Sequence, residues 1–205
     1  MKVVDIKVTP VTVPMEAPLR WSMGVEHATT RAILQVFTDE GITGIGETYG
    51  GNAVAHAIEL SRQFVLGLDP LEIGVLQHRL GVFRIGYETM IPAVVRAGIE
   101  MAFLDAAGKA LHRPIHALLG GKLRDRIEVA AYLFFRYKSE NGCKGGECTP
   151  EDIAERTREL VGRHGFRALK LKGGVLKPEE EFQAIRLLRR EYAASPLRWD
   201  PNAAW

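Results

Sequence analysis

The order of the predicted elements changes near Gly121. Before this residue strands come first and helices follow, which is typical of an α+β domain. After it strands and helices alternate strictly, and a β-α-β-α-β run implies parallel strands joined by helical crossovers. We therefore predict an α+β domain over residues 1–123 and the start of a β/α architecture over residues 124–205.

Three strands are predicted in the first part. Residues 2–13 alternate between apolar and polar side chains, and residues 31–37 and 42–48 form two further strands. Residues 38–41 join the last two as a hairpin turn, with Gly41 free to take a positive φ. The polar and aromatic residues 17–30 are predicted to form a loop, and long loops in compact domains are often functional lids.

Two longer helices follow the strands, over residues 52–66 and 92–112. The second begins at Pro92, a favoured position for helix entry. Its apolar stripe consists of Val95, Ile99, Ala102, Phe103 and Ala106. A short helix then leads to a glycine stop at Gly120 and Gly121.

The alternating part contains three predicted strands and two helices. The strands cover residues 127–135, 166–172 and 197–200, and the helices begin at Pro150 and Pro178. The apolar stripe of the second helix is predicted to be Phe182, Ile185, Leu188 and Tyr192. Three parallel strands do not complete a sheet, and a (β/α)₈ barrel needs about 250 residues. We therefore expect an incomplete TIM-type barrel, as a truncated chain or as part of something larger.

Composition excludes several classes of function. The formal net charge is +2, without a basic run, so nucleic acid is not expected as a partner. No apolar stretch approaches the roughly 20 residues that span a membrane. The N-terminus alternates like a strand and not like a signal peptide, which predicts a cytoplasmic protein. Cys143 and Cys148 are predicted to be free thiols, although a local disulfide or redox role remains the alternative.

Lys170 and Lys172 lie two residues apart on a predicted strand, so both side chains point to the same face. In a barrel this face is the interior, near the carboxyl end of the strand, while Leu169 and Leu171 face the helices. Two neighbouring cations depress each other's pKa, and a lysine with a lowered pKa can act as a general base. The alternative is a solvated strand face with two ordinary lysines.

Asp200 ends the next predicted strand. A carboxylate suits Mg²⁺, which prefers oxygen ligands. Pro201 holds Asp200 extended, and Asn202 follows as a possible ligand, substrate contact or orienting residue. The alternative is a simple Asx turn.

The two motifs together predict one kind of chemistry. Catalytic residues of barrels lie at the carboxyl ends of strands, and here a pair of lysines and a carboxylate end successive strands. The lysine would remove a proton next to a substrate carboxylate, and the metal would stabilise the resulting charge.

These residues resemble a known family. Residues 170–175 (KLKGGV) with 199–205 (WDPNAAW), and residues 132–135 (YLFF), are similar to the glucarate dehydratase branch of the enolase superfamily, of the mandelate racemase and muconate lactonizing enzyme type. Residues 43–47, 98–105, 108–111 and 118–121 are similar to the superfamily's N-terminal capping domain. The resemblance covers essentially the whole chain and implies a capping domain followed by the first part of the barrel.

The resemblance implies a role for each site residue. Lys172 would be the general base, and Lys170 would contact the substrate carboxylate. Asp200 would be the first of three Mg²⁺ ligands. Asn202 and Tyr132 would contact the substrate.

Two further residues would contact the distal part of the substrate. His27 would do so from the predicted N-terminal loop, and Thr89 is a weaker candidate of the same kind. The implied reaction is the Mg²⁺-dependent dehydration of an acid sugar, an aldarate such as glucarate. A homo-oligomer is also implied.

Two segments depart from the family's pattern, and both bear on which acid sugar is the substrate. The segment 136–148 is shorter here, and the predicted lid at residues 18–30 differs in length. The family's two other metal ligands and its His-Asp dyad lie on later strands, so the 205 residues alone are not expected to catalyse dehydration. Another superfamily dehydratase, an epimerase, and a non-catalytic truncated or assembly chain remain alternatives.

Overall fold

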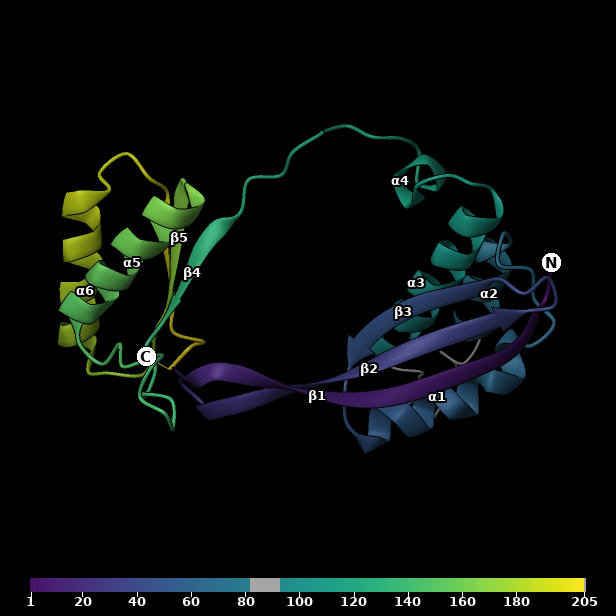
Figure 1. Cartoon of the computed structure of the whole chain (residues 1–205), viewed down its shortest axis with the longest axis horizontal. Helices are drawn as coiled ribbons and strands as arrows, with labels where there is room; N and C mark the ends of the chain where they lie inside the picture. The colour runs from purple at the N-terminus through teal and green to yellow at the C-terminus, as the bar shows by residue number, and fades with distance from the viewer. Residues whose placement is uncertain (82–92, 205) are drawn as a thin grey trace. The chain divides into compact units, whose positions relative to one another are not determined.

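The chain forms two compact units. The computed structural model describes residues 1–81 and 93–204. The first unit contains Met1–Val13 and Thr29–Leu123, and the second contains Pro14–Ala28 and Arg124–Trp205. Each has its own hydrophobic core (Figure 1). The second unit is thus built from two separate stretches of sequence, and a domain boundary after residue 123 stays a prediction.

A three-stranded sheet organises the first unit, and the hairpin end of two of its strands, residues 14–28, belongs to the second unit. Its strands are β1 (Val3–Trp21), β2 (Gly24–Thr38) and β3 (Thr43–Tyr49), in that spatial order. β2 and β3 are antiparallel. The predicted turn between them is confirmed, because Gly41 has a φ of 78° and the amide of Thr38 donates to the carbonyl of Ile42.

The predicted loop over residues 17–30 is wrong. β1 runs on to Trp21 and β2 starts at Gly24, so only residues 22 and 23 make the turn. Most side chains of this segment are not buried. The segment therefore lacks the apolar alternation that marks a half-buried strand. Strand pairing nevertheless continues, since it depends on backbone hydrogen bonds and not on apolar side chains.

Helices cover one face of this sheet (Figure 1). They are α1 (Asn52–Val65), α2 (Ile73–Gly81) and α3 (Ala93–Ala110), and the short α4 (Ile115–Leu118) follows α3 without a buried residue. The predicted stripe of α3 is confirmed, because all five of its residues are fully buried. Pro92 lies outside the described residues, and the sequence did not predict α2.

Helix α3 packs directly on β3. A Cβ atom at Gly46 would lie 2.1 Å from the carbonyl oxygen of Gly98, so a side chain there would push the helix away. Two polar contacts fix the same pair of elements: the amide of Ile45 donates to Asp105 (2.8 Å), and Lys109 donates to the carbonyl of Thr43 (2.8 Å). The motif around Asp105 and Lys109 therefore has a structural role in this unit.

Gly46→Ala is expected to lower the free energy of unfolding by about 1–3 kcal/mol, because overpacking forces the backbone apart. Gly74→Ala is the matched control, since Gly74 lies in α2 with no atom near its Cβ position. That substitution should stabilise by up to about 1 kcal/mol, because alanine favours a helix more than glycine does. Urea unfolding of both variants measures the difference, and equal effects would contradict the close packing of α3 on β3.

The second unit contains a parallel β/α run, as predicted. Its elements are β4 (Ala130–Phe134), α5 (Pro150–His164), β5 (Ala168–Lys172), α6 (Pro178–Glu191) and β6 (Leu197–Asp200). The strands are parallel in the order β4-β5-β6. Helices α5 and α6 pack on one face of this sheet (Figure 1). Leu169 and Leu171 are buried on that face. Lys170 and Lys172 therefore alternate to the other face.

The predicted apolar stripe of α6 is partly wrong. Phe182 is 47% exposed, although its ring packs against the edge of Trp199. The buried positions are Glu181, Ala184 and Leu188. Helix α6 is therefore turned so that a carboxylate takes a core position.

Two expectations from composition can be compared with the structure. Within residues 1–81 and 93–204, no helix has the length and apolarity that a membrane crossing requires. Cys143 and Cys148 are free and exposed, as predicted.

Candidate active site

Two lysines and an aspartate meet at the carboxyl ends of β5 and β6. The strand register places Lys172 opposite Asp200. The Nζ atoms of Lys170 and Lys172 lie 2.9 Å and 3.0 Å from the same carboxylate oxygen of Asp200. The sequence predicted this convergence, because the carboxyl ends of parallel strands meet at one edge of a sheet.

Asn202 completes the turn after β6. Its amide donates to Asp200 (3.1 Å), which is the predicted Asx turn, and its φ is 52°. Its side-chain oxygen also accepts a hydrogen bond from Lys172. The turn and the contact with the lysine therefore coexist.

Tyr132 lies beside the lysine pair on β4, opposite Lys170 in the register. The Nζ atom of Lys170 is 4.7 Å from the centre of the Tyr132 ring, and the centres of the Tyr132 and Phe134 rings are 4.4 Å apart. Tyr132 is 44% exposed, so it is not a buried core aromatic. An exposed tyrosine beside a cation can still receive a ligand.

The outcome differs for the other two predicted substrate contacts, His27 and Thr89. His27 lies on β2 and is exposed, and among the described residues no hydrogen bond or ion pair joins it to the lysines or to Asp200. Thr89 lies outside the described residues.

Asp200 controls the electrostatics of the cluster. Hydrogen bonds from Lys170 and Lys172 hold the pKa of the Asp200 carboxyl well below its ordinary value. The hydrogen bond to Asp200 raises the pKa of Lys170 above its ordinary value. The prediction that the pKa of Lys170 is depressed is therefore wrong, because the hydrogen bond to the shared carboxylate outweighs the lowering effect of desolvation.

The contribution of Asp200 to stability should depend on pH. A carboxyl whose pKa is depressed in the folded state stabilises the folded protein at pH values above its unfolded-state pKa of about 3.9. This stabilisation is lost as the pH falls through the folded-state pKa. The raised pKa of Lys170 acts in the opposite sense, so its contribution is present below about pH 10.4 and is lost above. We expect urea unfolding of the original chain and of Asp200→Asn to differ more at pH 7 than at pH 2.5. An equal difference at both pH values would contradict the ion pairs.

The cluster fits Mg²⁺ in the type of its oxygen atoms but not in their number. Asp200 offers a carboxylate and Asn202 an amide oxygen, both of which suit this cation. Within the described part of the chain, no group of three histidine, cysteine, aspartate or glutamate side chains could hold a metal ion. The described residues therefore supply at most part of a magnesium site.

The tip of the β1–β2 hairpin belongs to the same unit as the lysines. Leu19 forms an antiparallel bridge with Arg136, and the amide of Arg20 donates to the carbonyl of Phe135 (2.9 Å). This pairing brings Trp21 to Lys172, whose Nζ is 5.9 Å from the ring centre. The sequence analysis missed Trp21, and only its aromatic character within the predicted loop could have indicated a contact with a cation.

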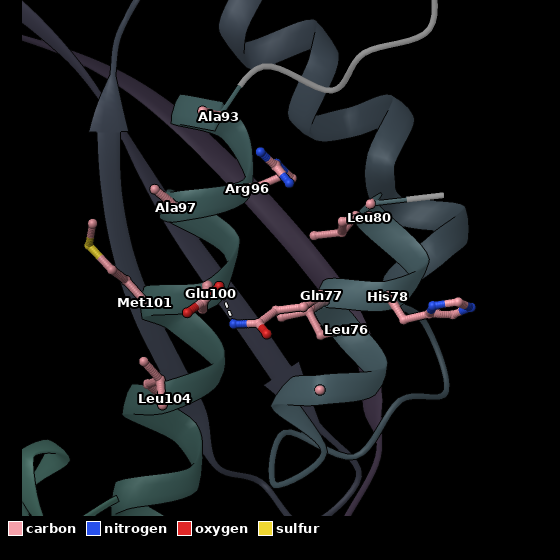
Figure 2. Close-up of a pocket in the computed structure, with 12 residues that line it drawn as sticks. Leu76, Gln77, His78, Leu80, Ala93, Arg96, Ala97, Glu100, Met101 and Leu104 are labelled. Carbon is pink, nitrogen blue, oxygen red and sulfur yellow. Dashed lines mark hydrogen bonds between the residues drawn. The ribbon is translucent and has the colours of Figure 1, made fainter. Parts of the chain in front are cut away.

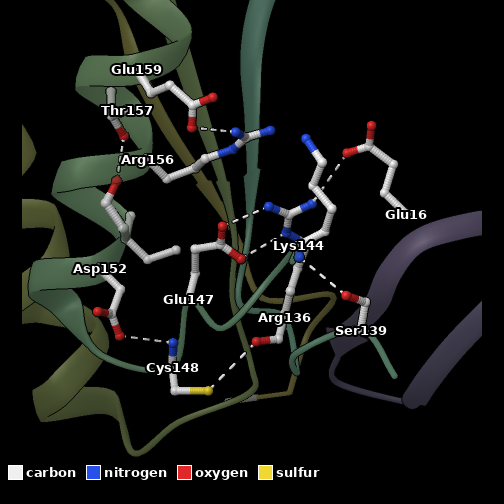
Figure 3. Close-up of polar contacts among 11 residues, drawn as sticks. Glu16, Arg136, Ser139, Lys144, Glu147, Cys148, Asp152, Arg156, Thr157 and Glu159 are labelled. Atoms are coloured by element: carbon white, nitrogen blue, oxygen red, sulfur yellow. Dashed lines mark hydrogen bonds and ion pairs between the residues drawn. The ribbon is translucent and has the colours of Figure 1, made fainter. Parts of the chain in front are cut away.

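A buried ion pair fixes the segment that follows β4 (Figure 3). Arg136 donates to both carboxylate oxygens of Glu147, at 2.7 Å and 2.5 Å, and both side chains are about nine-tenths buried. Hydrogen bonding to Glu147 raises the pKa of Arg136. Glu16 of the hairpin lies on the other side of the guanidinium, 4.0 Å away. The pair therefore helps to hold both the segment and the hairpin tip in the second unit.

The first unit has a separate pocket between α2 and α3, shown in Figure 2. Gln77 of α2 donates across it to Glu100 of α3 (3.2 Å). It contains none of the predicted site residues that the structure describes, so it gives no support for a second candidate site.

The fold and the cluster define a class of protein. An antiparallel sheet with helices, followed by parallel β/α units, is the arrangement that this chain shares with solved structures of the enolase fold. Residues 3–120 match the family model for the mandelate racemase / muconate lactonizing enzyme N-terminal domain. The chain belongs to this family of the enolase superfamily.

Individual relatives agree with this assignment. The chain is 36% identical to a probable glucarate dehydratase from Streptomyces coelicolor, over 100% of this chain and 53% of that protein. An enolase from Thermobispora bispora, solved with magnesium and formate, is 37% identical with a TM-score of 0.87 over 100% of this chain and 53% of its own. One from Mycobacterium smegmatis, solved with tartrate, is 34% identical with a TM-score of 0.87, over 100% and 51%. The chain thus spans about half the length of these relatives.

Proposed function

We propose that the protein carrying this chain is an acid-sugar dehydratase that acts on glucarate or a similar aldarate. The observation that carries the proposal is the meeting of Lys170, Lys172 and Asp200 at the ends of adjacent parallel strands. The probable glucarate dehydratase and the tartrate complex among the relatives support an aldarate. Assembly as a homo-oligomer and a cytoplasmic location stay predictions.

The chain's own residues would bind the substrate and move one proton. Lys172 would accept at Nζ the proton next to the substrate carboxylate, and hydroxide would then leave the β carbon. Lys170 would donate to that carboxylate. Tyr132 and Asn202 would contact the sugar acid near the reacting carbon.

Other parts of the site would come from elements that the described residues do not complete. His27 and Thr89 are proposed to contact the distal end of the substrate. Asp200 would contribute one ligand to Mg²⁺, which when bound supplies positive charge that stabilises the substrate carboxylate as the proton leaves.

A substrate panel tests the proposal. The full-length native protein that carries this sequence is purified, and its intact mass shows whether the polypeptide extends beyond these residues. It is then incubated with Mg²⁺ and a panel of aldarates and aldonates, and the 2-keto product is measured. We expect product from at least one aldarate, and none when a chelator removes the metal.

The same reactions in D₂O separate the alternatives. Exchange of the proton next to the carboxylate without loss of water would identify an epimerase and contradict the dehydratase. Neither exchange nor product from any acid sugar would favour a non-catalytic protein.

A further inference from the structure

Glu181 is a fully buried carboxylate on the first turn of α6. Its two oxygens accept four hydrogen bonds, all from neutral N–H groups. Three come from the backbone of Gly174 (3.0 Å), Val175 (2.7 Å) and Leu176 (2.9 Å), and one from the indole of Trp199 (2.9 Å). An apolar residue at this position would leave these donors without an acceptor, so the path of the loop depends on the carboxylate.

The four donors lie in two segments that adjoin Lys172 and Asp200 in the sequence. The loop over residues 173–177 starts directly after Lys172, and Trp199 directly precedes Asp200. The loop is also tied to β6 by the amide of Gly173, which donates to the carbonyl of Asp200 (3.0 Å). A single buried side chain thus joins the segments that carry the proposed base and the proposed metal ligand.

The backbone next to Glu181 is closely packed. A Cβ atom at Gly173 would lie 2.2 Å from the indole nitrogen of Trp199 and 2.3 Å from a Glu181 oxygen. Gly174 has a φ of 78°, a left-handed conformation that favours glycine. The amides of residues 174, 175 and 176 converge on the carboxylate, and such converging amides form the kind of concave site that binds anions. The chain fills that site with its own carboxylate.

We infer that Glu181 is a positioning residue, which holds Lys172 against Asp200 through the loop and Trp199. The inference rests on the proposed function for its consequence in catalysis. Glu181 does not touch the substrate in this account. It fixes the direction of the Lys172 side chain, which is 9% exposed and donates to Asp200 and Asn202.

The test compares Glu181→Gln with Glu179→Gln in the full-length native protein. Glutamine has nearly the same shape, but its NH₂ group replaces one acceptor oxygen, so two of the four hydrogen bonds are lost. Glu179 lies in the same turn of α6 and is exposed, so its substitution removes the same charge without disturbing the loop. Trp199→Phe removes one donor and serves as a milder variant if Glu181→Gln does not fold.

The first readout does not depend on turnover. An amine-acylating reagent labels lysines according to their access, and mass spectrometry compares Lys172 with the exposed Lys7 in each protein. We expect Lys172 to be labelled several-fold faster in Glu181→Gln, less so in Trp199→Phe, and at the original rate in Glu179→Gln. Equal labelling in Glu181→Gln and Glu179→Gln would overturn the inference whether or not the protein is a dehydratase.

The second readout is how the effect of the substitution divides between kcat and KM. A misplaced base lowers kcat by about 10- to 100-fold while KM changes little, because substrate binding does not require the proton transfer. Faster labelling of Lys172 with unchanged kcat would overturn the positioning role in catalysis. Faster labelling in a protein whose original form dehydrates no acid sugar would overturn the proposed function, while Glu181 would still be shown to hold Lys172.

Discussion

Replacing Lys172 by methionine should lower kcat for acid-sugar dehydration by ~10³-fold, within the range that a general base contributes. Methionine keeps most of the length and the apolar stem of lysine but cannot accept a proton. KM should change much less, because Lys170 and the other proposed contacts would still bind the substrate. Steady-state kinetics of the full-length native protein with Mg²⁺ give both values.

Lys7→Met is the matched control. Lys7 is an exposed lysine on β1, so its replacement removes the same group from a strand without touching the cluster. Its kcat should equal that of the original protein. A Lys172→Met variant that loses less than about tenfold in kcat would fall below the usual contribution of a general base and would contradict the proposed role.

Arg136→Met should lower the free energy of unfolding by about 3–5 kcal/mol, because it leaves the buried carboxylate of Glu147 without its cation. Both members of the pair are nearly covered, with side-chain exposures of 11% and 10%. A buried charge that loses its partner retains the cost of desolvation without the attraction that offset it. Urea unfolding monitored by circular dichroism measures the loss.

The exposed pair of Arg167 and Glu128 offers the control, since these side chains are 80% and 75% exposed. Arg167→Met should cost at most about 1 kcal/mol, because water screens such pairs. The double variant Arg136→Met with Glu147→Met should recover most of the stability, since neither charge then remains buried. Similar losses for Arg136→Met and Arg167→Met would contradict the importance of the buried pair.

Local patterns predicted most of the fold. The stripe of α3 and the start of α5 at Pro150 depend on neighbouring residues alone, and both are present in the structure. The segment over residues 17–30 could not be predicted in the same way, because its strands pair through the backbone and leave no apolar alternation. Its partners around Arg136 are distant in sequence, and no local signal indicates them.

The candidate site was likewise predicted only in part from the sequence. Lys170, Lys172 and Asp200 were predicted to converge because parallel strands end at one edge, and their ion pairs have this geometry. The raised pKa of Lys170 was missed, because it depends on which charge lies nearest, and only coordinates give that. Glu181 is one of three consecutive glutamates in the first turn of α6, and nothing in the local sequence distinguishes the buried one from the other two.

The discontinuous second unit has a consequence for synthesis on the ribosome. Residues 14–28 emerge from the exit tunnel early, yet the backbone groups outside the hairpin that pair with residues 18–20 belong to residues 135–137. Until those residues are translated, the hairpin tip has no partner in its own unit and presents unpaired strand edges. Such exposed edges are what chaperones protect during translation. The time that the ribosome needs to translate the segment through residue 137 thus sets how long the strand edges of the hairpin tip can pair incorrectly.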